Sequence, residues 1–403
     1  MNILAIESSC DETAAAVLRT GPNFPAQPDY ALLSNVVVSQ IDIFKAYGGV
    51  IPEVAARSHL EAVLPVIHQA LADANCTWAD ITHIAVTHTP GLLGSLLIGT
   101  LTARTLAILH DKPLYPVHHL KSHIYSAFFN NSLPNFPIIS LVISGGHTQI
   151  IYMPTPNDFQ IIGTTRDDAV GECFDKVAKI LGLPYPGGPA ISQAAKKGDE
   201  NKYKFPHPIL KKTDGTQSLD FSFSGLKTAV LRTVQKELNL PINHPSSDLK
   251  NHLTKKQIAD FAASFQKTAI DILLEKLSLA TSQYNCNSIV IAGGVSANKK
   301  LRERVLEKKS NSSLSGLAEV TTEQERPSPV TTTPWDAEGE AKPKPTGARD
   351  ATANEDIRLL LPDFSFSGDN AAMVALAAAY EIASGKQPHD PYHLDILPRS
   401  PIA

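Results

Sequence analysis

Two stretches of this sequence, about 137 residues apart, share one pattern: an apolar run, a short polar turn and a second apolar run. In the first stretch the apolar runs 3–6 and 14–18 flank the turn 7–13. In the second, the runs 138–143 and 148–152 flank the turn 144–147. Such runs on both sides of a turn predict a strand, a turn and a second strand. The repeat predicts two related α/β lobes.

A third apolar run, residues 289–292, precedes Gly293 and Gly294 and then a segment with helical periodicity. We expect a strand, a glycine turn and a helix capped by Ser296. A last helix is expected over about residues 370–384. The resulting division comprises an N-terminal lobe over 1–134, a second lobe over 135–369, and a helix and tail over 370–403 that close the fold.

Residues 310–356 have a different composition from the rest of the chain. They contain five prolines and many Ser and Thr residues, with 9 acidic and 4 basic side chains. So little apolar surface cannot offset the entropy lost on ordering. We therefore expect a disordered insertion in the second lobe.

Bulk composition excludes several classes of protein. Hydrophobic residues make up 43% and charged residues 19% of the 403 residues, which is typical of a globular protein. No apolar run reaches the about 18 residues that a membrane helix requires. The four cysteines form no CxxC pair, which favours a reducing, intracellular compartment. The first expected strand begins at Ile3 and leaves no room for a signal peptide, and the acidic insertion favours mitochondria over the bacterial cytoplasm.

Charge is distributed unevenly along the chain. The formal net charge is −4, but residues 196–256 contain 12 Lys and Arg against 6 Asp and Glu. A basic segment of this kind can bind the phosphates of a nucleic acid. It can equally be the solvated surface of helices, and charge alone does not separate the two interpretations.

A histidine pair follows Pro116. Apolar residues at 120, 124, 127 and 128 predict an amphipathic helix that starts after this proline. His119 and His123 are four residues apart beside that stripe, so their imidazoles can reach one metal ion. They can also be two surface histidines without a ligand. A zinc protease is disfavoured, because no glutamate follows His119 as HExxH requires.

Glycine turns follow two of the expected strands. Ser144-Gly145-Gly146 and Gly293-Gly294 stand at strand ends, and residues 186–189 form a third small turn. Backbone N–H groups in such turns can bind phosphate, and the missing side chains let a nucleotide approach. A single glycine turn is often structural, but three in one chain favour a nucleotide cleft.

Several polar residues have both a structural and a chemical interpretation. Asp11 and Glu12 follow the first strand and could orient a metal, a water or an amine, or form a plain polar turn. Asp175 is expected near a helix start, where the helix dipole favours it. Asp369 would precede the last helix, where N-capping explains an Asp. Asn298 could be a polar residue of a first helical turn.

Seven strings of this sequence resemble the tRNA N6-adenosine threonylcarbamoyltransferase family, long called glycoprotease or O-sialoglycoprotein endopeptidase, in its bacterial and mitochondrial branch. They are IESSCDET (6–13), PVHHLKSH (116–123), LVISGGHTQ (141–149), GECFDK (171–176), YPGGP (185–189), DFSFSGLKT (220–228) and AGGVSAN (292–298). The resemblance covers nearly the whole chain outside 310–356. It implies the two-lobed actin, hsp70 and sugar-kinase fold with a cleft between the lobes.

The resemblance also implies roles for individual residues. His119, His123 and Asp369 would hold one divalent metal ion per subunit, iron or zinc. Asp11 and Glu12 would be the catalytic acidic pair. The threonylcarbamoyl-adenylate would be bound by Val142, Ile143, Ser144, Gly145, Gly146, Asp175, Gly188, Ser192 and Asn298. The implied partners are tRNA, the synthase that makes the adenylate, and a second copy or helper proteins, with no membrane.

The implied reaction transfers the threonylcarbamoyl group to N6 of the adenosine next to the anticodon, in tRNAs reading codons that begin with A. Two alternatives share the fold. An ATP-dependent phosphotransferase would have a similar cleft but seldom needs the paired histidines. A non-catalytic tRNA-modification scaffold typically lacks the pair, which this chain retains at His119 and His123.

Overall fold

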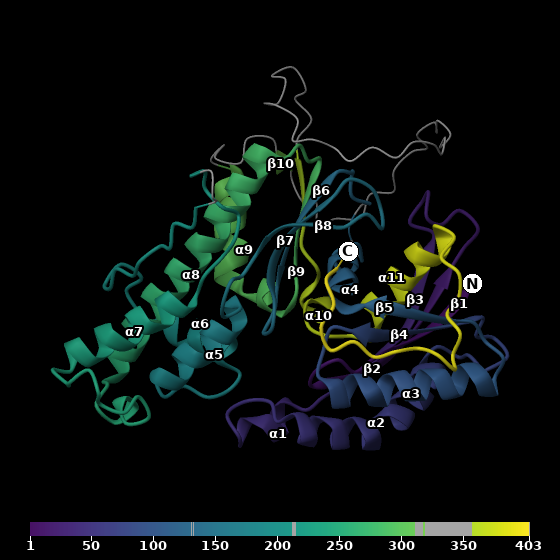
Figure 1. The fold of residues 1–403 in the computed structure, drawn as a ribbon, viewed down its shortest axis with the longest axis horizontal. Helices are drawn as coiled ribbons and strands as arrows, with labels where there is room; N and C mark the ends of the chain where they lie inside the picture. Colours follow the sequence, from purple (N-terminus) through teal and green to yellow (C-terminus); the bar gives the residue numbers. More distant parts are fainter. Residues whose placement is uncertain (130, 132, 212–214, 311–316, 319–356, 403) are drawn as a thin grey trace.

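The computed structural model describes residues 1–129, 131, 133–211, 215–310, 317–318 and 357–402 (Figure 1). The expected disordered insertion, 310–356, therefore lies outside the described residues except for Ser310, Leu317 and Ala318. The described chain forms two mixed β-sheets with helices on their faces. Among the described residues, no helix is both long and apolar enough to cross a lipid bilayer.

The first sheet has the strand order β3-β2-β1-β4-β5. Its strands are β1 (Asn2–Glu7), β2 (Glu12–Thr20), β3 (Tyr30–Ser39), β4 (His83–Thr89) and β5 (Leu114–His118). β1, β2 and β3 pair antiparallel, whereas β1, β4 and β5 pair parallel. The accompanying helices are α1 (Ile41–Lys45), α2 (Pro52–Asp73), α3 (Leu93–Leu109), α4 (His119–Ser126) and α11 (Ala371–Ala383).

The second sheet has the order β10-β11-β9-β6-β7-β8. Its strands are β6 (Ile138–Ile143), β7 (Thr148–Met153), β8 (Gln160–Thr164), β9 (Ser288–Ala292), β10 (Leu317–Ala318) and β11 (Ile357–Leu360). β6, β7 and β8 pair antiparallel, whereas β6, β9 and β11 pair parallel. Apart from β10, this repeats the order and directions of the first sheet, so the predicted pair of strand–turn–strand units is confirmed.

The helices that accompany the second sheet are α5 (Val170–Ile180), α6 (Gly187–Ala195), α7 (Ser224–Glu237), α8 (Lys255–Gln283) and α9 (Lys299–Ser310). A short helix, α10 (Phe364–Ser367), contacts α4 and the turn before α9. Two 3-10 turns, η1 (Leu249–Asn251) and η2 (Gly294–Ala297), precede α8 and α9. Although α11 follows the second sheet in sequence, it packs against the strands of the first.

The strands are apolar on both faces because three separate cores enclose the two sheets. In β1, Leu4 and Ile6 contribute to the core beneath α2 and α3, whereas Ile3 and Ala5 contribute to a core around α4 and α11. This central core also receives residues of the second sheet, so α4 and α11 lie between the sheets (Figure 1). Alternate side chains of a strand point to opposite faces, and burial on both faces gives the continuous apolar runs.

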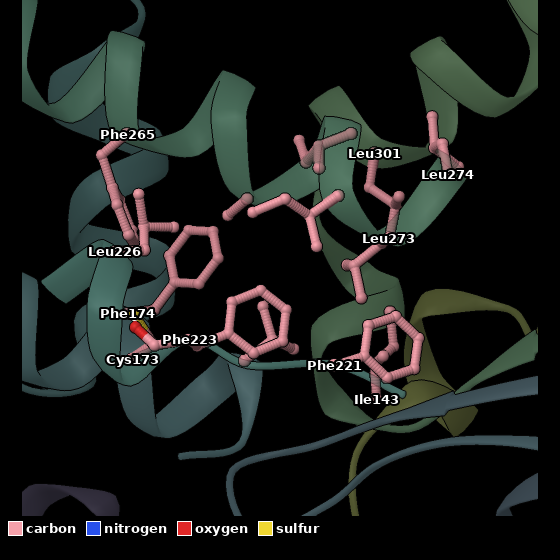
Figure 2. Packing of buried hydrophobic residues seen from close by; sticks show 14 of the residues in the cluster. Ile143, Cys173, Phe174, Phe221, Phe223, Leu226, Phe265, Leu273, Leu274 and Leu301 are labelled. Carbon is pink, nitrogen blue, oxygen red and sulfur yellow. Dashed lines mark hydrogen bonds between the residues drawn. The ribbon is translucent and has the colours of Figure 1, made fainter. Parts of the chain in front are cut away.

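The third core lies between the second sheet and its helices (Figure 2). Figure 2 shows Phe174 of α5 beside Leu226 of α7, with Ile143 of β6 near Phe221. Phe174 meets Phe265 of α8 edge-to-face at a centroid separation of 4.9 Å. Burying large aromatic side chains supplies much of the stability of such a core. This core fixes the elements that carry one wall of the cavity described below.

The predicted helix after Pro116 is confirmed, whereas the predicted cap of the next glycine-turn helix was wrong. Pro116 itself belongs to β5, and α4 begins at His119, where the side chain of His118 accepts the N–H of Leu120. Ser296 lies in η2 and does not cap α9. Asn298 does so instead, because its Oδ1 accepts the N–H of Leu301 at 3.2 Å. For α9, local patterning located the helix but not its first turn.

Candidate metal centre and substrate cavity

A cavity of about 1580 Å³ lies where the parallel strands of both sheets end. Residues one or two positions after the ends of β1, β4, β5, β6 and β9 line it. In α/β folds the carboxyl ends of parallel strands are the usual place for a ligand, because loops from several strands meet there. This position brings together residues from both halves of the chain.

His119, His123 and Asp369 meet at this end of the first sheet. Oδ1 of Asp369 lies 3.5 Å from Nε2 of His119 and 3.1 Å from Nε2 of His123. The two imidazole rings, one helical turn apart on α4, stand edge-to-face at 4.6 Å. All three donor atoms lie within 4.8 Å of one another. His119 and Asp369 line the cavity, and His123 lies buried behind them.

The far side of His119 is held by residues of the first strand and its turn. Nδ1 of His119 lies 3.3 Å from Oε2 of Glu7 and 3.2 Å from Oγ of Ser9. Glu7 is fully buried and also accepts the hydroxyl of Thr87 and the N–H of Ser9. A histidine that donates Nδ1–H to a carboxylate presents its Nε2 lone pair to a cation.

The charged groups around His119, His123 and Asp369 favour a positive charge among these three residues. Burial alone would lower the pKa of His119, but Asp369 and Glu7 outweigh it and raise the pKa to about 9. Burial would raise the pKa of Asp369, yet His119 and His123 hold it well below its ordinary value. Two ionised carboxylates in a poorly solvated place stabilise a cation, whether a proton or a metal ion.

The surroundings of His123 and Asp369 also suit a bound metal ion. Both ring nitrogens of His123 are buried, and neither makes a hydrogen bond of good geometry to a described residue, although Nε2 lies close to Asp369. A buried polar atom without such a bond is costly, and coordination would satisfy it. Asp369 is not used as a helix cap, because Asn370 caps α11 by accepting the N–H of Met373. Two imidazoles and one carboxylate suit iron or zinc.

The acidic pair Asp11 and Glu12 belongs to the same cavity as the glycine turns. Both line the cavity, and Oε1 of Glu12 accepts the hydroxyl of Ser39 at 3.2 Å. Burial and the nearby charge of Asp369 raise the pKa of each carboxyl group. A carboxyl group with a raised pKa holds its proton to higher pH and is a stronger base once ionised, so such a pair can donate or accept a proton in general acid–base chemistry.

Most of the residues implied to bind the adenylate line the same cavity. They are Ser144, Gly145, Gly146, Asp175, Gly188, Ser192 and Asn298. Val142 and Ile143 do not line it. Their side chains belong to the cores on opposite faces of the second sheet, so only backbone groups there could reach a ligand. The site roles of all these residues remain predictions.

The glycine turn after β6 is packed against α5. A Cβ built at Gly171 would lie 2.6 Å from the carbonyl oxygen of Ser144 and 2.8 Å from Cα of Gly145. Gly145 and Gly146 themselves have open space around them. The absence of a side chain at Gly171 therefore lets α5 approach the turn closely, while the turn itself faces the cavity.

Asp175 occupies an unexpected position. It is the sixth residue of α5 and not near the helix start, so the helix-dipole interpretation was wrong. Its Oδ1 accepts the N–H of Gly187 at 2.7 Å, which ties α5 to the first turn of α6. Burial, with contributions from Asp11 and Glu172, raises the pKa of Asp175 from its ordinary 3.8 to about 6.

Replacing Asp175 by asparagine is expected to stabilise the protein at pH 7–8. The native carboxyl binds its proton more tightly when folded, so its ionisation costs stability progressively as pH rises from about 4 to about 6, by at most about 3 kcal/mol. The asparagine side chain would retain the acceptor for Gly187 without charge. Thermal unfolding of both proteins between pH 4 and pH 8 measures this difference. The exposed Asp158→Asn serves as control, and an equal pH profile in wild type and Asp175→Asn would contradict the argument.

Two residues of this site were missed from the sequence. Glu7 lies at the end of an apolar strand, and a carboxylate at a buried strand end needs a partner, which is the signal that could have identified it. Gln266 of α8 is buried, and its Oε1 accepts from Ser192 and Asn298 at 2.8 and 3.1 Å. Nothing in the apolar pattern around Gln266 indicated this contact.

Comparison with known proteins identifies the relatives of this chain. The family model for tRNA N6-adenosine threonylcarbamoyltransferase matches residues 31–318. A curated protein of that name from Listeria welshimeri is 40% identical over 385 residues, covering 96% of this chain and 92% of its own length. The chain belongs to this threonylcarbamoyltransferase family. A namesake from Syntrophus aciditrophicus is 46% identical over 308 residues, covering 76% of this chain and 83% of the relative.

A solved structure supports the fold independently. Full-length HypF in its phosphate- and nucleotide-bound form superposes with a TM-score of 0.54 at 14% identity, covering 95% of this chain and 55% of HypF. At that identity the likeness concerns the fold alone. Together with the two sheets of matching strand order, it confirms the predicted two-lobed fold of the actin, hsp70 and sugar-kinase class.

Proposed function

We propose that this protein transfers the threonylcarbamoyl group of threonylcarbamoyl-adenylate to N6 of the adenosine next to the anticodon, in tRNAs that read codons beginning with A. Family membership supports the reaction. The observation that carries the proposal is the convergence of His119, His123 and Asp369 beside a glycine-turn cavity. Because Asp369 is far from the two histidines in the sequence, only the fold brings the three residues together.

The three converging residues would hold one divalent metal ion, iron or zinc. When bound, such an ion supplies Lewis-acid polarisation of the threonylcarbamoyl group. The N–H groups of the 144–146 turn would bind the phosphate of the adenylate, and Asp175, Gly188, Ser192 and Asn298 its nucleoside. Glu7 and Ser9 would hold His119 in the orientation that presents Nε2.

Asp11 and Glu12 would act on the amine that attacks the adenylate. The adenosine N6 forms a bond to the carbamoyl carbon while the bond from that carbon to the phosphate oxygen breaks and AMP leaves. Asp11 or Glu12 would orient the amine and take the proton that it loses. The adenosine must reach the cavity from a splayed loop, which is how proteins usually read single bases of RNA.

The exposed residues outside the cavity support contacts with two kinds of partner. The described lysines of the 196–256 segment are mostly exposed, and Lys196 lines the cavity, which supports this segment as a tRNA contact. A row of exposed leucines covers the outer helices: Leu60 and Leu64 of α2 with Leu93, Leu97 and Leu101 of α3. Apolar rows of this kind mark protein interfaces, which supports a homodimer or a helper-protein complex.

The compartment would be the mitochondrion or the bacterial cytoplasm. Bacterial relatives support the second of these, and the acidic insertion favours the first.

The proposal is tested by reconstitution with the purified protein. Unmodified tRNA, threonine, bicarbonate and ATP are supplied with an adenylate-making synthase, and nucleosides are analysed by mass spectrometry. We expect threonylcarbamoyladenosine and one AMP for each modified base. Preformed adenylate should replace threonine, bicarbonate, ATP and synthase together. Failure with preformed adenylate in the presence of candidate helper proteins, or phosphorylation of a small metabolite instead, would refute the assignment.

A further inference from the structure

We propose that His244, Asp248 and His252 form a second metal site, which binds a divalent transition-metal ion of the zinc type. Nε2 of His244 and Nε2 of His252 each lie 3.0 Å from the same oxygen, Oδ2 of Asp248. The three donor atoms lie within 4.8 Å of one another. None of these residues lines the cavity described above.

The geometry of this second trio resembles that of the first. In both, two imidazoles present Nε2 to a single carboxylate oxygen, and the rings stand edge-to-face, here at 5.8 Å and 77°. Two imidazoles and one carboxylate oxygen are a ligand set that zinc commonly takes, with a water completing the coordination. Side chains of 20%, 44% and 46% exposure, in the order His244, Asp248, His252, leave one side open for that water.

The carboxylate of Asp248 is held in an orientation that suits metal binding. Oδ1 of Asp248 accepts the side-chain amide of Asn251 at 2.8 Å, so Oδ2 alone faces the two imidazoles. Hydrogen bonds to the distant oxygen of a ligating carboxylate are a common feature of metal sites, because they fix its orientation.

The backbone that carries the ligands is fixed on both sides. Nε2 of the buried Gln235 donates to the carbonyl oxygens of Ile242 and His244 at 3.0 and 3.2 Å. Arg232 donates to Ile242 at 2.7 Å, and Leu249, next to Asp248, is fully buried. A site with its backbone already in place loses less entropy on binding an ion. The ion would therefore clamp the connection between α7 and α8.

A simpler interpretation is a carboxylate between two protonated histidines without any metal. The two interpretations differ in what happens when a metal ion is offered. Protonated imidazoles bind no cation, whereas a metal site takes up one ion and releases any protons from the ligands. Zn²⁺ alone is therefore a sufficient probe.

The test uses the full-length chain with the first site removed. In the variant His119→Ala/His123→Ala, calorimetric titration with Zn²⁺ at pH 7.5 should give about one ion per chain and raise the melting temperature. Adding His244→Gln/His252→Gln should abolish both effects. The matched control His389→Gln/His393→Gln, which removes two histidines near Asp390, should leave both effects unchanged.

A wild-type comparison keeps the test decisive if the first variant does not fold. Wild type should then bind about two Zn²⁺ ions and His244→Gln/His252→Gln about one. The site does not exist if the His119→Ala/His123→Ala protein binds no zinc, or if the two glutamine substitutions leave the stoichiometry unchanged. Neither result bears on the transferase reaction, which is assayed separately.

Discussion

Replacing His119 and His123 together by alanine is expected to abolish metal binding at the first site and to slow threonylcarbamoyl transfer by about 10³-fold or more. Both imidazoles point Nε2 at Asp369, and no other described residue forms such a group within the cavity. Several kcal/mol of transition-state stabilisation would be lost with the ion. Metal analysis of the protein and the initial rate of nucleoside modification measure the two effects.

Two further variants separate chemistry from folding in this prediction. Asp369→Asn keeps the size of the third side chain and should cause a comparable loss, although it leaves α4 untouched. The double variant His389→Ala/His393→Ala removes two exposed histidines outside the cavity and should transfer at the wild-type rate. Full activity of a demonstrably metal-free His119→Ala/His123→Ala protein would discard the metal-centred scheme.

Replacing Gly293 by alanine is expected to lower the free energy of unfolding by about 2–4 kcal/mol. Gly293 has φ 91° and ψ 164°, a backbone conformation that is almost confined to glycine. A Cβ there would lie 2.5 Å from the carbonyl oxygen of Ile143. Because both the conformation and the close approach of β6 require glycine, relaxation of a flexible side chain cannot relieve the strain. Chemical denaturation measures the change.

The neighbouring glycine supplies the control. A Cβ built at Gly294 meets nothing within 4 Å, and its φ lies outside the left-handed region. Gly294→Ala should therefore change the free energy of unfolding by less than about 1 kcal/mol. Equal losses in the two variants would show that the cost arises from something other than backbone geometry at Gly293.

Prediction from sequence succeeded where a structure depends on neighbouring residues. The two hairpins and α11, which is capped by Asn370 and ends at Ala383, follow from apolar periodicity and local polar residues. The position of Asp175 was predicted wrongly because its helix begins at Val170, without a side-chain cap to mark the start. Its contact with Gly187 depends on how α5 packs against α6, which no local pattern records.

Local spacing was enough to predict the repeated strand–turn–strand units, the glycine turns and the i,i+4 histidine pair, because each depends on a few neighbouring residues. The groups that surround that pair are set by tertiary packing. Asp369 lies about 250 residues from His119, and Glu7 over 100 residues in the other direction. The resemblance implied Asp369, but Glu7 was missed. Contacts of this kind are fixed by the packing of α4 and α11 between two sheets, and local spacing carries no information about them.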